Sequence, residues 1–373
     1  MERKINAEMF VLRSVACLSI ALLHALYRVY DGETSWVESI GLLLTFGTPV
    51  FVFISQFVLS FAYPAGTPAG FWSKRIKYIL LPYVIFGTLY AGLKGLDLAG
   101  REGLPLVGAV WYYLWRHLLL GDFHGYFILV IFQFYALHMV FQRLAGRLSP
   151  RRVLPVSFAI NVAYLAFFNF TQPGDSAALH YIWDKMYWLF FPGWLFYFTG
   201  AYYLGRHERW FRDQLKRFRL AAYGLPVATG ALVLLVNGQG WITAHSSKRI
   251  DMLLFASSMI VFLFAAASSM RRIPAVLEWI SRYSFGIYLL HPLLLAVFAM
   301  APASFGLRSL GVFSVALQFA GCVVGSALLM QLANRVPGGA YVVGRVGIGL
   351  GRKREDEPQA GGSASPATPA PES

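Results

Sequence analysis

The sequence predicts an all-α protein, a helical bundle that crosses a membrane about ten times. Of its 373 residues, 57% are hydrophobic and only 13% are charged, and the mean hydropathy is +0.55. Soluble domains carry about a quarter charged residues, so this composition indicates an integral membrane protein. Ten apolar stretches are long enough to span about 30 Å of hydrocarbon. They cover approximately residues 8–27, 38–62, 77–94, 125–142, 153–170, 188–205, 220–236, 252–270, 284–300 and 310–332.

The stretch 106–120 is an eleventh apolar candidate. It contains Trp111, Trp115, Arg116 and His117. Aromatic and basic side chains are typical of an amphipathic helix that lies in the membrane interface. We therefore expect this stretch to lie along the membrane surface rather than to cross it.

The distribution of basic residues predicts the orientation in the membrane. The chain has 32 Lys and Arg against 18 Asp and Glu, a net charge of +14. Most of the basic residues fall in alternate loops, for example around 74–77, 143–152 and 206–219. Cytoplasmic loops carry such an excess, so both termini are expected in the cytoplasm of a multi-pass plasma-membrane protein. This orientation explains the charge without a nucleic-acid partner.

The chain divides into a membrane domain and a tail. Residues 1–335 hold the apolar stretches, and 336–373 are expected to form a cytoplasmic tail. From about residue 355 Gly, Ser, Ala, Pro and Thr dominate, which predicts disorder. The first stretch lacks a small-residue cleavage site and is expected to remain as a span. Cys17 and Cys322 lie in apolar stretches, which indicates buried packing.

Arg13 and His24 are polar residues inside the first apolar stretch. Their eleven residue steps turn an α-helix by about 1100°, three turns plus about 20°, so both side chains share one face about 16 Å apart. A guanidinium near the cytoplasmic side can grip phosphate, and a deep neutral imidazole can act as a general base. Alternatively, Arg13 reaches the lipid headgroups and His24 bonds a neighbouring helix.

Other polar residues are candidates for the same site. Lys74 and Arg75 precede the third stretch. Their charges either set the orientation of this span in the membrane or bind the phosphates of an anionic donor. Polar residues within spans either line a cavity or form hydrogen bonds between helices. Polar residues in the loops either belong to a site or are exposed to solvent. The candidates for a cavity or an acceptor site are Ser55, Gln56, Asp122, His124, Tyr126, His180, Tyr288 and His291. Neither a zinc-ligand spacing nor a glycine-rich nucleotide loop is found, so we expect no metal and no bound cofactor.

Several of these motifs together resemble the membrane acyltransferase-3 family. Arg13 with ten residues before His24, the basic cluster ending in Pro82-Tyr83, and Tyr288-Leu289-Leu290-His291-Pro292 fit its recurring segments. Phe46-Gly47-Thr48-Pro49, Gly125-Tyr126-Phe127-Ile128 and Gly193-Trp194-Leu195-Phe196-Tyr197 are similar to the subset linked to intercellular-adhesin, or poly-N-acetylglucosamine, synthesis. The resemblance spans roughly residues 5–335. Many members have Ser-Gly-Phe where this chain has Ser55-Gln56-Phe57.

The resemblance implies a bundle of about ten helices and transfer of a short acyl group, acetyl or succinyl. The donor would be a cytoplasmic acyl-CoA, and the acceptor a sugar hydroxyl of a surface polysaccharide such as poly-N-acetylglucosamine. Arg13 and His24 would be the catalytic residues, and Arg13, Lys74 and Arg75 would bind the donor. Membrane lipid, the polysaccharide and a polysaccharide synthase complex are the expected partners.

A transporter or exporter of the polysaccharide is the main rival hypothesis. Arg13, His24 and His291 would then line a polar path through the membrane. Carriers commonly have two related halves with paired broken helices, and the sequence shows no such internal symmetry. A scaffold for a synthase complex is a third interpretation, but it leaves the charge of Arg13 inside a span unexplained.

Overall fold

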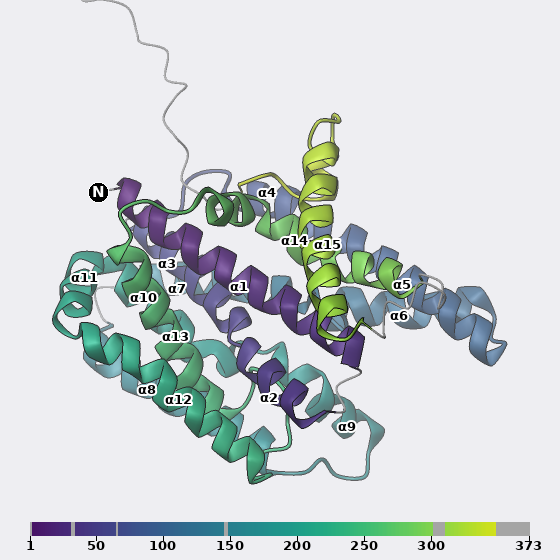
Figure 1. Ribbon diagram of the computed structural model, residues 1–373, viewed down its shortest axis with the longest axis horizontal. Coiled ribbons are helices and arrows are strands. Elements are labelled where there is room, and N and C mark those ends of the chain that lie inside the picture. The colour runs from purple at the N-terminus through teal and green to yellow at the C-terminus, as the bar shows by residue number, and fades with distance from the viewer. Residues whose placement is uncertain (1, 31–33, 65, 145–147, 301–309, 348–373) are drawn as a thin grey trace, which may run out of the picture.

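The computed structural model describes residues 2–30, 34–64, 66–144, 148–300 and 310–347, and for residues 2–6 the backbone alone. Within these ranges the chain is a bundle of helices without strands (Figure 1). The longer helices are α1 (Glu2–Tyr30), α3 (Gly47–Ala62), α5 (Leu81–Glu102), α6 (Leu106–Leu120), α7 (Tyr126–Leu144), α8 (Pro150–Phe170), α10 (Leu195–Arg206), α12 (Arg219–Gly238), α13 (Ile250–Ser269), α14 (Ala275–Ala299) and α15 (Val312–Ala333). The shorter ones are α2 (Ser35–Leu44), α4 (Phe71–Arg75), α9 (Ala177–Asp184), α11 (Glu208–Arg217) and α16 (Gly339–Val342).

Nine helical segments of the described chain are long and apolar enough to cross a membrane. They confirm the predicted polytopic all-α class and match nine of the ten predicted stretches. The stretch 188–205 differs. It consists of the 3₁₀ turns Met186–Trp188 and Phe191–Trp194 followed by the 12-residue α10. Pro192 and Gly193 interrupt the helix here, because proline cannot donate an N–H and glycine favours irregular backbone.

The irregular backbone before α10 is satisfied by a side chain of α7. Gln133 donates from Nε2 to the Leu189 carbonyl at 2.8 Å and accepts from the Phe191 N–H at 3.1 Å. Broken helices are tolerated at membrane depth only when neighbouring groups replace the lost hydrogen bonds. Gln133 therefore allows a short helix where the sequence pattern predicts a continuous span.

Helix α1 lies at the centre of the bundle, packed against α3, α13, α14 and α15 (Figure 1). Gly47 permits its close approach to α3. A Cβ at this position would lie 2.7 Å from the carbonyl oxygen of Ala16. Since Ala16 lies between Arg13 and His24, this contact fixes the polar face of α1 against the rest of the bundle.

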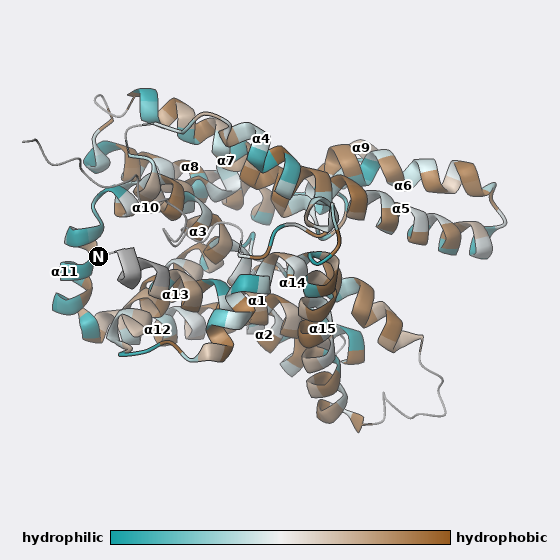
Figure 2. Ribbon diagram, turned by 90° about the horizontal axis from the view of Figure 1, so that it is seen from above, coloured by the Kyte–Doolittle hydropathy of each residue, from teal (hydrophilic) through white to brown (hydrophobic). Residues whose placement is uncertain are grey.

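Buried ion pairs hold the N-terminal half of α1. Arg212 of α11 donates from Nη2 to Oε2 of Glu8 at 2.7 Å, and it also pairs with the Glu8 Oε1 and with Glu208. Ser268 of α13 donates to the same Glu8 carboxylate at 2.8 Å. Figure 2 shows the contrast between hydrophilic α11 and the largely hydrophobic α15. We call these contacts of Glu8 with Arg212 and Ser268 the clamp. The clamp joins α1, α11 and α13 near the N-terminal end of α1.

Helix α6 packs along α5 as a hairpin that extends from the bundle (Figure 1). Trp111 and Trp115 on α6 are 64% and 40% exposed. The chain after the last span is folded in its first part, because α16 contacts α5 and Tyr341 stacks on Tyr78 at 5.4 Å. The disorder predicted from about residue 355 lies outside the described residues.

Candidate functional site

Two cavities lie along α1. The Arg13 cavity has a volume of about 130 Å³ and the His24 cavity about 770 Å³. Helices α1, α3, α7 and α14 contribute side chains to both. Arg13 and His24, which are predicted to share a face of α1, therefore line separate but neighbouring cavities. Their spacing of eleven residues along the helix places each side chain at its own cavity.

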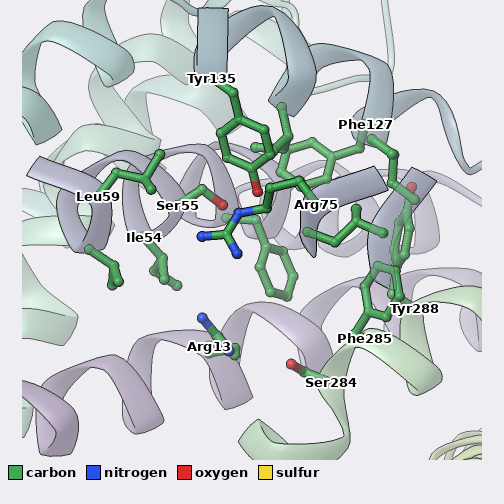
Figure 3. Close-up of a pocket in the computed structure, with 15 residues that line it drawn as sticks. Arg13, Ile54, Ser55, Leu59, Arg75, Phe127, Tyr135, Ser284, Phe285 and Tyr288 are labelled. Atoms are coloured by element: carbon green, nitrogen blue, oxygen red, sulfur yellow. The ribbon is translucent and has the colours of Figure 1, made fainter. Parts of the chain in front are cut away.

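The Arg13 cavity combines two guanidinium groups with hydroxyl groups. Its polar lining residues are Arg13, Ser55, Arg75, Tyr135, Ser284 and Tyr288. Figure 3 shows the guanidinium groups of Arg13 and Arg75 pointing toward one space from α1 and from α4. Among the described residues that line it, none is acidic. A low-dielectric space with this lining favours a ligand that carries negative charge.

Arg75 owes its position to a local break in helix geometry. It ends α4, and the π-helical turn Ile76–Leu80 follows before α5 begins. Its guanidinium carbon lies 4.8 Å from the centre of the Phe71 ring and 5.4 Å from that of Tyr135. Its Nε is buried without a hydrogen-bond partner among the described groups. Single π turns are frequent at functional sites, and here the turn directly follows the residue that faces the cavity.

Five histidines line the His24 cavity, and three of them, His24, His124 and His291, form a cluster. The ring centre of His291 lies 5.1 Å from that of His24 and 5.8 Å from that of His124. His291 Nδ1 lies 2.8 Å from the Ile287 carbonyl oxygen. A carbonyl can only accept, so Nδ1 carries the proton and neutral His291 presents its lone pair on Nε2. That Nε2 is buried and has no partner in the described part of the structure.

The other candidate residues have different environments. Tyr126, Asp122 and His180 line the His24 cavity, and Asp122 pairs with Arg116 at 3.2 Å. Tyr288 lines both cavities. Lys74 is exposed and lines neither cavity. Gln56 also lies outside both. It is buried in a helix contact, where its Nε2 lies 2.8 Å from Nδ1 of His138.

Tyr135, Ser284 and Lys248 are among the cavity residues that the sequence pattern missed. Tyr135 shares the cavity face of α7 with Ile128 and Ile131. This helical spacing is visible in the sequence, but it did not reveal which face of α7 points inward. Ser284 is a polar residue in a predicted span, the same signal that selected Ser55. Lys248, outside the candidate spans, gave no local signal.

Lys248 lies in the loop between α12 and α13 and lines the His24 cavity. It is 2% exposed, and its Nζ donates to the Gly193 carbonyl at 3.1 Å. Burial lowers the pKa of this ammonium well below its ordinary value. Across the described residues, no group of three or more His, Cys, Asp or Glu has a geometry that could hold a metal ion.

A central helix with a polar face, nine candidate spans and two adjoining cavities define a multi-pass membrane protein with an internal site. The family model described as "Acyltransferase domain" matches residues 6–333, so the chain belongs to the acyltransferase-3 family and is a membrane acyltransferase. The names of its staphylococcal relatives connect this family with a polysaccharide.

The relatives include "Putative membrane-bound acyltransferase YfiQ" of Bacillus subtilis. It is 37% identical over 353 residues, which cover 91% of this chain and 94% of YfiQ. "Probable poly-beta-1,6-N-acetyl-D-glucosamine export protein" of Staphylococcus aureus Mu50 is 28% identical over 303 residues, 79% of this chain and 83% of its own. The protein of that name from Staphylococcus epidermidis is 26% identical over 302 residues, 79% and 82% of the two chains. No solved structure gives a significant match.

Proposed function

We propose that this protein transfers a short acyl group from acyl-CoA to a sugar hydroxyl of a cell-surface polysaccharide. The observation that carries the proposal is the pair of adjoining cavities on α1, one lined by two guanidinium groups and the other by the cluster of His24, His124 and His291. Phosphates of the donor bind at Arg13 and Arg75, because guanidinium groups form charge-assisted hydrogen bonds to phosphate oxygens. The sugar occupies the larger His24 cavity.

His24 acts as the general base. His291 holds its proton on Nδ1 through the Ile287 carbonyl, so its Nε2 can accept a hydrogen bond from the neighbouring His24 ring. His24 then presents its other nitrogen, which carries a lone pair, to the acceptor hydroxyl. An intramembrane imidazole without a carboxylate beside it stays neutral, as a base must before it takes a proton.

The reaction forms a carbon–oxygen bond and breaks the carbon–sulfur bond of the thioester. The hydroxyl proton moves to His24 as its oxygen attacks the acyl carbon, and the proton leaves with the thiolate of coenzyme A. Two routes give this overall reaction. In one, the sugar attacks the thioester directly and His24 takes the hydroxyl proton. In the other, a carbon–nitrogen bond to the His24 imidazole forms as the carbon–sulfur bond breaks, and the imidazole proton leaves with the thiolate; the sugar then attacks the acyl-imidazole, and the departing nitrogen takes the hydroxyl proton. Trapping of an acyl adduct on the purified protein distinguishes them.

The orientation with both termini in the cytoplasm belongs to this proposal, and it requires the broken stretch 186–206 to cross the membrane as a tenth span beside the nine candidate helices. It places the Arg13 cavity toward cytoplasmic acyl-CoA and the His24 cavity toward the extracytoplasmic polysaccharide. The positive-inside distribution of the loops supports it. The protein would then work beside a polysaccharide synthase complex in the plasma membrane.

The test measures acyl transfer by purified protein in lipid nanodiscs. His24→Ala is expected to lower kcat at least 100-fold, because positioned general bases contribute about 10²–10⁴-fold. His207→Ala is the matched control, since this exposed histidine lies outside both cavities. Equal transfer by the wild type and His24→Ala at equal protein levels would refute the catalytic role.

A second pair of variants tests donor binding. Arg75→Gln is expected to raise the KM for acyl-CoA about tenfold, because a hydrogen bond to a charged group contributes about 1.5–3 kcal/mol. Lys74→Gln removes a neighbouring charge that faces away from the cavity and is expected to change the KM less than twofold. An equal rise for both variants would assign the effect to general surface charge.

Export of the polysaccharide is the second candidate function, favoured by the names of the staphylococcal relatives. Mass spectrometry of the polymer from a deletion strain separates the two functions. Full-length surface polymer without acyl esters supports the acyltransferase. Polymer retained inside the cell supports the exporter.

A further inference from the structure

Three aromatic side chains line both cavities. Phe51 of α3, Phe127 of α7 and Tyr288 of α14 face the Arg13 cavity on one side and the His24 cavity on the other. Their rings form a continuous row, with 6.1 Å between the centres of Phe51 and Phe127 and 6.3 Å between those of Phe127 and Tyr288. We call these three side chains the partition. Figure 3 shows Phe127 and Tyr288 at one end of the Arg13 cavity.

The partition has one fixed side and two sides held by packing alone. The hydroxyl of Tyr288 donates to the carbonyl oxygen of His124 at 2.6 Å, which ties this ring to the chain segment before α7. Phe51 and Phe127 have no polar atoms in their side chains, and both are half-buried. Rotation of a phenyl ring breaks no hydrogen bond, so these two rings can yield while Tyr288 stays in place.

The partition is also apolar. Its one side-chain heteroatom, the Tyr288 oxygen, already donates to a backbone carbonyl. An ionised group that passes between these rings would lose its hydration without gaining a partner, which is costly in a low-dielectric environment. A thin hydrocarbon or thioester segment loses little hydration there and makes favourable contacts with the rings.

We propose that Phe51, Phe127 and Tyr288 form the opening through which the acyl end of the donor reaches His24, and that they select an unbranched, uncharged acyl group. This inference rests on the proposed function, because phosphates held at Arg13 and Arg75 leave the acyl group on the near side of the partition. The acyl group is the leading end of the donor and must pass the rings first. The transferred group is therefore of the acetyl type and not succinyl.

The cross-section of the acyl group, and not its length, is the selected property. A linear chain has the same width whatever its length, and the His24 cavity of about 770 Å³ has room for several carbons. A branched chain must displace a ring. One misplaced carbon in an apolar site changes transfer rates about 10- to 200-fold. Butyryl-CoA and isobutyryl-CoA contain the same atoms and differ in width, so they form a matched pair of probes.

The experiment measures kcat/KM for acetyl-, succinyl-, butyryl- and isobutyryl-CoA with the full-length protein in nanodiscs. The wild type is expected to favour butyryl over isobutyryl, and acetyl over succinyl, by at least about tenfold. Phe51→Ala and Phe127→Ala are expected to reduce the butyryl preference to about threefold or less. Phe158→Ala is the control, because Phe158 is a half-buried phenylalanine of the same hydrophobic core that lies outside both cavities.

Each other result has a defined meaning. An unchanged butyryl preference in both partition variants overturns the proposal. So does a wild type that uses isobutyryl-CoA as well as butyryl-CoA, or succinyl-CoA as well as acetyl-CoA. If an alanine variant does not fold, Phe51→Leu and Phe127→Leu replace it, since leucine keeps an apolar side chain with less width. Folded variants inactive toward all four donors would assign the rings to catalysis and also overturn selection. A wild type that transfers from no thioester refutes the proposed function instead.

Discussion

Arg212 of α11 holds the N-terminal half of α1, so Arg212→Gln is expected to lower the free energy of unfolding strongly. The Glu8 carboxylate is 2% exposed and accepts hydrogen bonds from both terminal nitrogens of Arg212, whose side chain is 17% exposed. Removal of one partner leaves a buried charge uncompensated, which costs about 3–5 kcal/mol. Ser268 still donates to Glu8 at 2.8 Å, but Glu208 also loses its pair with Arg212, so we expect a loss within this range of about 3–5 kcal/mol.

The assay is reversible unfolding in mixed micelles, followed by circular dichroism. Lys216→Gln on the same helix is the control. Its pair with Asp213 spans 3.8 Å between side chains that are 82% and 72% exposed. Exposed pairs contribute about 0–1 kcal/mol, so this variant is expected to unfold almost like the wild type.

A double-mutant cycle isolates the clamp itself. Glu8→Gln together with Arg212→Gln leaves no unpaired charge between these two residues, so the double variant is expected to lose less stability than the sum of the single variants. Additive losses, or a loss below about 1 kcal/mol for Arg212→Gln, would refute the reasoning, since the penalty arises from an unpaired buried carboxylate.

Two further predictions concern the packing of α10 and the buried lysine. Gly205→Ala is expected to cost about 1–3 kcal/mol in unfolding experiments, because the added Cβ would lie 2.7 Å from the Phe57 carbonyl oxygen. Gly200→Ala on the same helix meets no atom within 4 Å and should leave stability unchanged or slightly raised, so equal losses would contradict the packing argument. The lowered pKa of Lys248 means that the unfolded chain binds a proton that the folded protein lacks between that pKa and about 10.4. Stability should therefore rise with pH across this window, and Lys248→Met should abolish the rise in pH-dependent unfolding curves.

The sequence predicted the class of the protein and two polar residues that line cavities on α1. Hydropathy and span length locate nine candidate spans, because a helix in lipid must be apolar and of sufficient length whatever it packs against. The spacing of Arg13 and His24 follows from helix geometry alone. Each of the two side chains lines a cavity on α1, as a polar face inside a span suggests.

The stretch 188–205 shows where local pattern was insufficient. Its composition fits a span, yet the helix is broken there. Gln133 of another helix allows this break, because it makes hydrogen bonds to backbone groups that the break leaves without helical partners. Gln56 and Ser55 show the same limit. Adjacent residues on a helix point in different directions, so Ser55 reaches the Arg13 cavity while Gln56 is buried against His138.

The sequence by itself therefore determined the membrane class, the helical spans and the polar face of α1, since all three depend on composition and on the geometry of one helix. Only the tertiary structure decided that this face opens into two cavities, and that Phe51, Phe127 and Tyr288 lie between them. These rings come from helices far apart in the chain, and their meeting depends on how α3, α7 and α14 pack. No local pattern encodes that contact, because it is a property of the packed helices together.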